Sequence, residues 1–261
     1  MRVVNLCSGS DGNMTYIESD EAKILIDIGL SCREAEKRLA LIGVNPKHIS
    51  CILVTHEHSD HIKGVDVFAS KHDVPIFAHH EVWYGLDEKL KKVPAMNKKM
   101  FDGDKFGFRD LIIHAIKVPH DVPCFAFSVE KNAKKISILT DLGHTNDRIL
   151  QSVRGSSIVY LEANYDEKML REGTKYPLAL KRRIGGQFGH LSNVESARTI
   201  LYLVQNGTKQ IVLSHMSKEN NDPDLAFDFI TQILSQYGVI EGENVKIDIA
   251  TTNVGTIFKI V

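Results

Sequence analysis

The chain has 261 residues, of which 43% are hydrophobic and 25% are charged. This composition is typical of a soluble globular protein and excludes a disordered chain. Lys and Arg number 32 against 33 for Asp and Glu, so the net charge of −1 excludes a bulk polycation, and nucleic-acid binding would need local basic patches. No apolar run reaches the ~18 residues of a membrane span. The four cysteines form no CxxC pair, which favours reduced thiols in a cytoplasmic protein.

Short apolar runs alternate with helical patterns along the chain. A strand is predicted over 23–27, followed by a helix over 31–42 that begins with the capping box Ser31-Cys-Arg-Glu34 and ends at Gly43. No linker or repeat interrupts the chain, so we expect one domain over 1–261, of class α/β or α+β. The remaining predicted elements are strands over 51–54, 75–78, 111–118, 124–129, 136–140, 157–161, 210–214, 245–249 and 255–260, and helices over 62–71, 194–205 and 224–237.

A histidine-rich segment, Thr55-His-Glu-His-Ser-Asp-His61, directly follows the predicted strand 51–54. Its imidazole and carboxylate groups are preferred ligands of zinc and its first-row neighbours. His56 and His58 are two residues apart, so their side chains point the same way from an extended backbone. Asp60 and His61 lie beyond a turn and can face a second ion. The spacing therefore predicts a metal site that can hold two ions.

This HxHxDH pattern resembles that of the metallo-β-lactamase superfamily, and the other motifs of that family occur in its order. They are Asp27 at the end of an early strand, His120 in Val118-Pro-His-Asp-Val122, Asp141 in Leu139-Thr-Asp-Leu-Gly143, and a final His that ends a late strand. The resemblance implies an α+β, four-layer αββα fold, in which two packed mixed sheets are flanked by helices. It also implies that His56, His58 and His120 hold one metal, that Asp60, His61 and His215 hold the other, that Asp141 bridges them, and that Asp27 orients the HxHxDH loop.

Two further residues could help a leaving group to depart. Glu162 follows the predicted strand 157–161, and His190 precedes the predicted helix 194–205. A carboxylate that orients an imidazole makes a general acid, and hydrolysis of a phosphodiester needs one because a sugar oxygen is a poor leaving group. Nucleases of the superfamily carry an acidic residue and then a histidine in this order. The resemblance therefore implies catalytic roles for Glu162 and His190 beside that of Asp60.

Small and basic side chains mark candidate contacts with a substrate. The loop Ser8-Gly-Ser-Asp-Gly-Asn13 could cradle a phosphate on its backbone N–H groups, although it could equally be an ordinary glycine turn. Residues 167–187 carry six basic and two acidic side chains, and so do residues 89–105. Such patches favour a phosphate backbone, with a solvated helix face as the alternative. The candidate substrate-binding residues are Ser8, Ser10, Asn13, Lys181, Arg182, Arg183, Ser192 and Asn193.

Taken together, the motifs at 8–13, 119–121, 161–164, 189–193 and 213–221 resemble those of the YycJ (WalJ) family. These are bacterial proteins of the metallo-β-lactamase fold, described as DNA exonucleases that degrade from the 5′ end and are linked to mismatch repair. The resemblance implies a cytoplasmic hydrolase with two divalent ions, Zn²⁺ or Mn²⁺, that acts on DNA in repair. Tyr165 departs from the pattern, since a histidine is expected there. It is either a phenol over the cleft or a packed aromatic.

Two alternatives to a nuclease stay open at this point. A metal-dependent thioesterase or lactonase of the glyoxalase II type would use the same metal ligands, and the basic segments would then face away from the site. A non-catalytic binding protein that has lost its metals is a third class. The complete ligand set argues against that third class, because loss of function usually removes ligands first.

Overall fold

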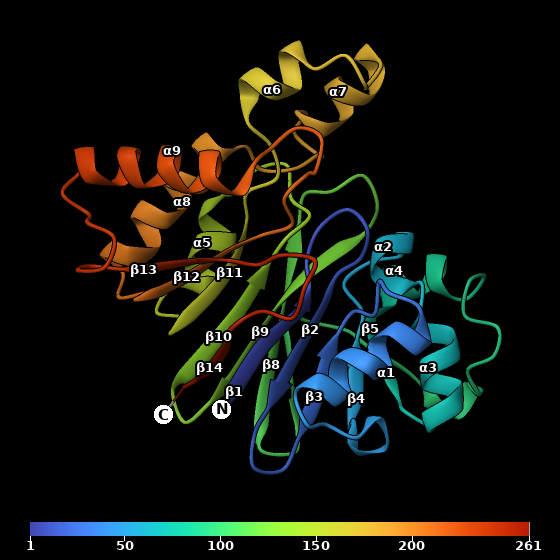
Figure 1. Cartoon of the computed structure of the whole chain (residues 1–261). Coiled ribbons are helices and arrows are strands. Elements are labelled where there is room, and N and C mark those ends of the chain that lie inside the picture. Colours follow the sequence, from blue (N-terminus) through green and yellow to red (C-terminus); the bar gives the residue numbers. More distant parts are fainter. Residues whose placement is uncertain (261) are drawn as a thin grey trace. The chain divides into compact units, whose positions relative to one another are not determined.

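The computed structural model describes residues 1–260 (Figure 1). The chain divides into two compact units. The first comprises residues 1–115 and 129–132 together with the described residues from 251 onward, and the second comprises residues 116–128 and 133–250. A single domain over 1–261 stays a prediction.

The first unit contains a seven-stranded mixed sheet of order β14-β1-β2-β3-β4-β5-β6. Strands β14, β1, β2 and β3 pair antiparallel, whereas β3, β4, β5 and β6 run parallel. Helix α1 packs on β1 and α3, and α4 packs on β5 and β6. The strands are β1 (Arg2–Cys7), β2 (Met14–Glu18), β3 (Lys23–Ile26), β4 (Cys51–Leu53), β5 (Ile76–His79), β6 (Lys98–Phe101) and β14 (Ile257–Lys259); the helices are α1 (Cys32–Leu41), α2 (Ser59–Ile62), α3 (Val65–His72) and α4 (His80–Leu86), with 3₁₀ turns at Pro46–His48 and Ala95–Asn97.

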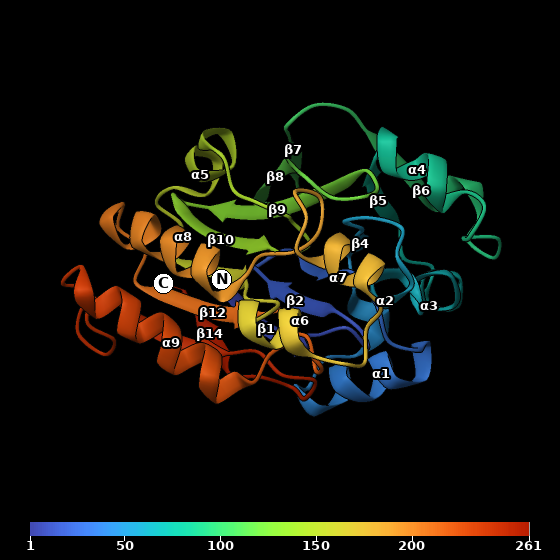
Figure 2. The same cartoon turned by 90° about the horizontal axis from the view of Figure 1, so that it is seen from above.

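The second sheet has seven strands in the order β13-β12-β11-β10-β9-β8-β7. Strands β10 to β13 run parallel and lie in the second unit. Helices α8 and α9 of this unit lie side by side in both views (Figures 1 and 2), and α5 contacts α8. The strands are β7 (Lys105–Phe108), β8 (Leu111–Val118), β9 (Cys124–Lys131), β10 (Lys134–Leu139), β11 (Ile158–Glu162), β12 (Gln210–Ser214) and β13 (Lys246–Ile249); the helices are α5 (Asp147–Val153), α6 (Glu167–Glu172), α7 (Leu178–Ile184), α8 (Asn193–Gln205) and α9 (Pro223–Gln236).

The parallel strands of the second sheet bring acidic and histidine side chains to one edge of that sheet. The apolar side chains of β10, β11 and β12, such as Leu161 and Leu213, are buried in a core that includes residues of α8 and α9. Because neighbouring parallel strands point the same way, the residues at their carboxyl ends gather at a common edge. That edge carries Asp141, Glu162 and His215 in the second unit.

The predicted fold class is confirmed, since the chain is α+β with two mixed sheets flanked by helices. The predicted strands agree with the structure to within about two residues at either end. One predicted helix is wrong in detail: residues 62–71 form the end of α2 and most of α3, with a break at Gly64. The N–H of Gly64 donates to the carbonyl of Ile28 at 2.8 Å instead of to the preceding helical turn, so the helical hydrogen-bond pattern is interrupted at this residue. Within residues 1–260, no helix combines the length and apolar character needed to cross a membrane.

Candidate active site

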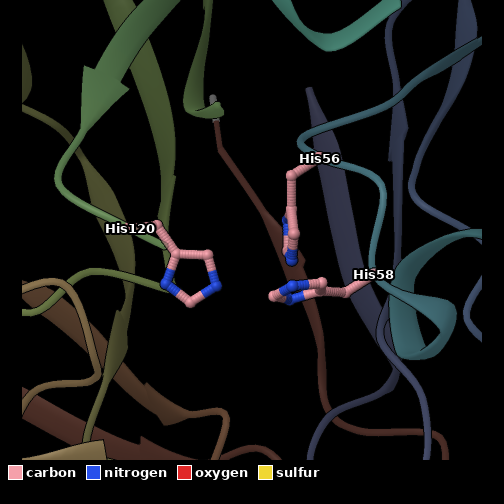
Figure 3. Close-up of side chains that lie close together, drawn as sticks. All are labelled: His56, His58 and His120. Atoms are coloured by element: carbon pink, nitrogen blue, oxygen red, sulfur yellow. The ribbon is translucent and has the colours of Figure 1, made fainter. Parts of the chain in front are cut away.

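The HxHxDH segment links β4 to α2 in the first unit. His56 is fully buried, His58 immediately precedes α2, and Asp60 and His61 lie within that helix. Figure 3 shows the imidazoles of His56 and His58 extending from this loop, and their ring centroids lie 4.7 Å apart. The Oδ2 atom of Asp60 lies 3.5 Å from Nε2 of His61. The short turn of α2 therefore divides the motif into two pairs, as the spacing predicts.

Asp27 holds the base of this loop. Its Oδ1 accepts a hydrogen bond from the backbone N–H of Thr55 at 2.9 Å, and its Oδ2 accepts one from the Thr55 hydroxyl at 2.7 Å. The same Oδ2 lies 2.7 Å from Nδ1 of His61. A carboxylate at Nδ1 fixes the proton there and leaves Nε2 as the coordinating nitrogen. This geometry supports the orienting role that the resemblance implies for Asp27.

Gly29 lies where three backbone segments of the first unit meet. Its N–H donates to the carbonyl of Asn13, and the N–H of Asn13 donates to the carbonyl of Asp60, both at 2.8 Å. A Cβ at Gly29 would lie only 1.7 Å from the Asp60 carbonyl oxygen. Glycine is required here because any side chain would push the HxHxDH loop away from β3.

Replacing Gly29 by Ala should destabilise the protein by about 1–3 kcal/mol, because the added methyl overpacks a contact between rigid backbones. The displaced Asp60 carbonyl should also lower the amount of metal retained. Urea unfolding and metal analysis of the purified variant measure both effects. Gly107→Ala is the matched control, since nothing lies within 4 Å of a Cβ there. A Gly29→Ala variant as stable and as metal-loaded as this control would contradict the expectation.

Glu57 faces α4 instead of its neighbouring histidines. Lys89 Nζ donates to both the backbone carbonyl of Glu57, at 3.0 Å, and its Oε1, at 3.1 Å. The carboxylate fills the space above Gly85, where a Cβ would lie 0.9 Å from Oε2. The sequence assigns Glu57 no chemistry, and its contacts instead fasten the HxHxDH loop to α4.

Glu162 is the centre of the cluster in the second unit. It is fully buried, and its Oε1 accepts hydrogen bonds from Nδ1 of His190 at 2.7 Å and from Nδ1 of His215 at 2.9 Å. Its Oε2 accepts from the backbone N–H groups of Leu142 and Leu191. Burial alone would raise the pKa of Glu162, but His190 and then His215 hold that pKa well below its usual range. Glu162 is therefore an anion that directs two imidazoles.

The bond from Glu162 to His215 is a feature that sequence reasoning missed. The resemblance assigns Glu162 to His190 alone. The parallel pairing of β11 with β12 sets Glu162 opposite Ser214, the residue before His215, so their common edge was the available signal.

Three of the candidate residues share an uncommon backbone conformation. Asp27, Asp141 and His215 each lie just beyond a strand with φ between 54° and 60°. Residues other than glycine seldom adopt this left-handed region, although Asp and His tolerate it better than most. Such strain is often found at functional sites. In each case it turns the side chain sharply at the sheet edge.

His120 lies beyond β8 in the loop shown in Figure 3. Its Nδ1 is 3.3 Å from the carbonyl oxygen of Gly189, to which it can donate, and its Nε2 is 3.3 Å from Oδ1 of Asp121. The Oδ2 of Asp121 in turn pairs with Arg183. Sequence reasoning did not assign Asp121 a role, and its signal was only that it follows His120 directly.

Two of the three predicted substrate contacts near the first strand, Ser8 and Asn13, form hydrogen bonds within the protein. Ser8 is buried and its N–H donates to the carbonyl of Thr251, whereas Ser10 is exposed. Asn13 is buried, accepts from the N–H of Gly9, and places Nδ2 3.0 Å from Nε2 of His61. Asn13 thus touches a predicted metal ligand. Contact of Ser8, Ser10 and Asn13 with substrate stays a prediction.

The remaining predicted substrate contacts lie within about ten residues of His190 in sequence. The Ser192 hydroxyl caps α8 by accepting from the N–H of Glu195, and Asn193 is buried against Asn221. Both side chains hold the start of α8, and their contact with substrate also stays a prediction. Lys181, Arg182 and Arg183 form the last turn of α7, where Arg182 and Arg183 are exposed.

Tyr165 is a packed aromatic. The residue is 9% exposed, and its carbonyl accepts from the N–H of Asn193. Burial, with smaller contributions from Glu167 and Glu162, raises the pKa of Tyr165 to about 12. Of the two readings left open by the sequence, the structure favours the packed ring.

A third group of possible ligands lies between α1 and α3. Cys32 Sγ is 3.5 Å from Oε1 of Glu36, and His72 Nε2 is 2.7 Å from the same oxygen. Lys71 Nζ also donates to that oxygen at 2.7 Å. The lysine already supplies a positive charge, so we interpret this group as an ion-paired contact that joins the two helices.

The donor atoms within each unit have separations that suit a metal ion. Two ligands about 2.1 Å from a tetrahedral ion lie about 3.4 Å apart. Nε2 of His215 is 3.4 Å from Oδ1 of Asp141, and Nε2 of His61 is 3.5 Å from Oδ2 of Asp60. The donors are imidazole and carboxylate groups, which suit zinc and its first-row neighbours. The residues present therefore fit divalent metal.

Comparison with known proteins agrees with this chemistry. The family model of the metallo-beta-lactamase superfamily matches residues 8–215. The chain is 38% identical to exodeoxyribonuclease YycJ of Bacillus anthracis, over 93% of this chain and 92% of that protein. It is also 38% identical to exodeoxyribonuclease WalJ of Streptococcus pneumoniae (strain D39), over 93% of this chain and 91% of that protein. The metallo-β-lactamase-fold protein YhfI of Bacillus subtilis is similar in structure, with a TM-score of 0.74, 16% identity and 98% of each chain covered.

Proposed function

We propose that this chain, which belongs to the metallo-β-lactamase superfamily, is a metal-dependent exonuclease that acts on DNA. The family and the metal-dependent hydrolase expected from the motifs are confirmed. Relatives named exodeoxyribonucleases align over more than nine-tenths of the chain, which leaves the thioesterase alternative less supported. The observation that carries the proposal is the Glu162 carboxylate, which hydrogen-bonds His190 beside the predicted ligand His215.

Two divalent ions, Zn²⁺ or Mn²⁺, form part of the proposal. His56, His58 and His120 would hold one, Asp60, His61 and His215 the other, and Asp141 would bridge them. When bound, such a pair supplies an acidified water and a clamp on the reacting phosphate. Among the chain's own residues, Asp27 directs His61 and Glu162 directs His215 through their Nδ1 atoms. These contacts keep the opposite Nε2 atoms available as ligands.

His190 is proposed as the donor of the leaving-group proton. With its Nδ1–H bonded to Glu162, its Nε2 is the atom that would protonate the departing sugar oxygen. The anionic Glu162 stabilises the positive imidazolium that this step requires. The His190 side chain is 21% exposed, so it can reach a substrate, whereas the Glu162 side chain is fully buried. A group placed in this way favours substrates with a poor leaving group, as in nucleic acids.

Lys181 and Arg182 of α7 are proposed to hold the DNA backbone without reading its sequence. Changing both to Gln should weaken binding and reduce the slope of log K against log salt by about 2, since each phosphate contact contributes about 0.9. Fluorescence anisotropy at several salt concentrations measures this slope. Hydrolysis of bis(p-nitrophenyl) phosphate should survive, because that substrate is too small to need the helix. An unchanged slope would mean that these side chains are only a solvated face.

The direct test of the proposed function is digestion of DNA and RNA labelled at either end, with Zn²⁺ or Mn²⁺ added back to metal-free protein. We expect mononucleotide release from the 5′ end of DNA. A thioester substrate run in parallel tests the glyoxalase II-like alternative, and hydrolysis of the thioester alone would reject the nuclease. A cytoplasmic location and a role in DNA repair belong to the same proposal.

A further inference from the structure

The segment from α7 to His190 is fastened to the loop that carries His120. Nε and Nη2 of Arg183 lie 2.6 and 2.5 Å from Oδ2 of Asp121. Six residues further along, the Gly189 carbonyl lies 3.3 Å from Nδ1 of His120. All of these residues belong to the second unit. The segment and the loop are thus joined at two points, one ionic and one through the backbone.

Backbone hydrogen bonds close the chain between Arg183 and His190 into a tight turn. The N–H of His190 donates to the carbonyl of Ile184 at 2.9 Å, and the N–H of Gly189 donates to that of Gly186 at 3.0 Å. A Cβ at Gly189 would lie 2.1 Å from the Ile184 carbonyl oxygen, so only glycine allows this tight turn. Because these hydrogen bonds hold the turn in one conformation, the position of Arg183 sets the position of the His190 imidazole.

We propose that Asp121 and Arg183 form a positioning pair for the exonuclease reaction. Their ion pair fixes the turn that presents His190 to the leaving group and presents the Gly189 carbonyl to His120. The inference rests on the proposed function for its reaction, but not for the geometry it describes. It assigns Arg183 to the protein's own Asp121, whereas the sequence predicts that Arg183 contacts DNA.

The two roles of Arg183 predict opposite effects of removing the Asp121 charge. If Arg183 binds a DNA phosphate, Asp121 competes with that phosphate, so Asp121→Asn should tighten DNA binding and steepen its salt dependence. If the pair positions the turn, Asp121→Asn should leave that dependence nearly unchanged and slow the chemical step. The Arg183 side chain is 58% exposed, and an exposed pair adds little to overall stability. The variants should therefore remain folded.

The experiment compares Asp121→Asn, Arg183→Met and the double variant on a thymidine dinucleotide, which has a poor leaving group and is too short to engage α7 fully. Small displacements of a catalytic group cost up to about 100-fold, so each single variant should lower kcat about 10- to 100-fold with little change in KM. The double variant should be no slower than either single variant. Arg198→Met is the matched control, because Arg198 forms an exposed ion pair with Glu195 on α8 of the same unit.

Hydrogen exchange at the Gly189 and His190 amides provides a readout that does not depend on the proposed function. Both amides should exchange faster in Asp121→Asn and Arg183→Met than in the parent and in Arg198→Met. If the parent cleaves no DNA, the exonuclease proposal fails while exchange still tests the pair. Unchanged exchange, or full dinucleotide turnover with tighter DNA binding in Asp121→Asn, would overturn the inference.

Discussion

Replacing Asp141 by Asn should abolish phosphodiester hydrolysis and reduce the bound metal. Asp141 is buried, lies just beyond β10 and places Oδ1 3.4 Å from Nε2 of His215. A carboxylate that bridges two cations supplies a negative charge to both, and an amide supplies none. Metal chemistry contributes several kcal/mol to the transition state, so its loss corresponds to on the order of 10³-fold or more in rate. Metal analysis and turnover of bis(p-nitrophenyl) phosphate measure the two effects.

Asn is the informative substitution because it removes the negative charge of Asp141 and leaves the backbone conformation unchanged. Asp141 has φ of 60°, and Asn tolerates this left-handed region as well as Asp does. Asp73→Asn is the matched control, since Asp73 has φ of 55° at the exposed end of α3. The control should keep full activity and metal. Two bound ions with near-normal turnover in Asp141→Asn would remove Asp141 from the bridging position.

The strands and the residues at their ends could be predicted because the signal is local. Runs such as residues 158–161 are apolar, short and buried, so they are typical of strands in a covered sheet. Each is followed by a polar residue that the family pattern recognises. A parallel sheet then brings these ends to one edge without further information. This is why the order of motifs was enough to predict the fold class.

Helix α7 could not be predicted because it has no buried residue. Without an apolar stripe there is no helical period to detect, and only its cluster of basic side chains drew attention. The partner of Arg183 was also hidden, since Asp121 is 62 residues away in sequence. The role of Gly29 depends in the same way on two distant backbone segments. Such features arise from tertiary contact and leave no periodic trace in the sequence.

His190→Ala should slow cleavage of DNA by about 10²- to 10⁴-fold, the usual cost of losing a general acid. The loss should shrink with bis(p-nitrophenyl) phosphate, because p-nitrophenolate departs without a proton. Metal content should match that of the parent and of the surface control His48→Ala. Loss of metal would instead make His190 a ligand, as its place in a group with Asp141, Glu162 and His215 allows.

Glu162→Gln should be the more damaging variant, and it should affect both substrates. If Glu162 oriented His190 alone, Glu162→Gln would have a smaller effect than His190→Ala, since the imidazole would still be present. Here the same Oε1 accepts from His190 and His215, and Oε2 accepts from two backbone N–H groups in a fully buried site. The amide NH₂ of Gln would replace one of these oxygens, and it would then face N–H groups that also donate. We therefore expect lower metal content as well as slower turnover, measured by metal titration alongside kcat on both esters. Normal metal affinity in Glu162→Gln, with a defect confined to poor leaving groups, would show that the bond to His215 has no part in holding metal.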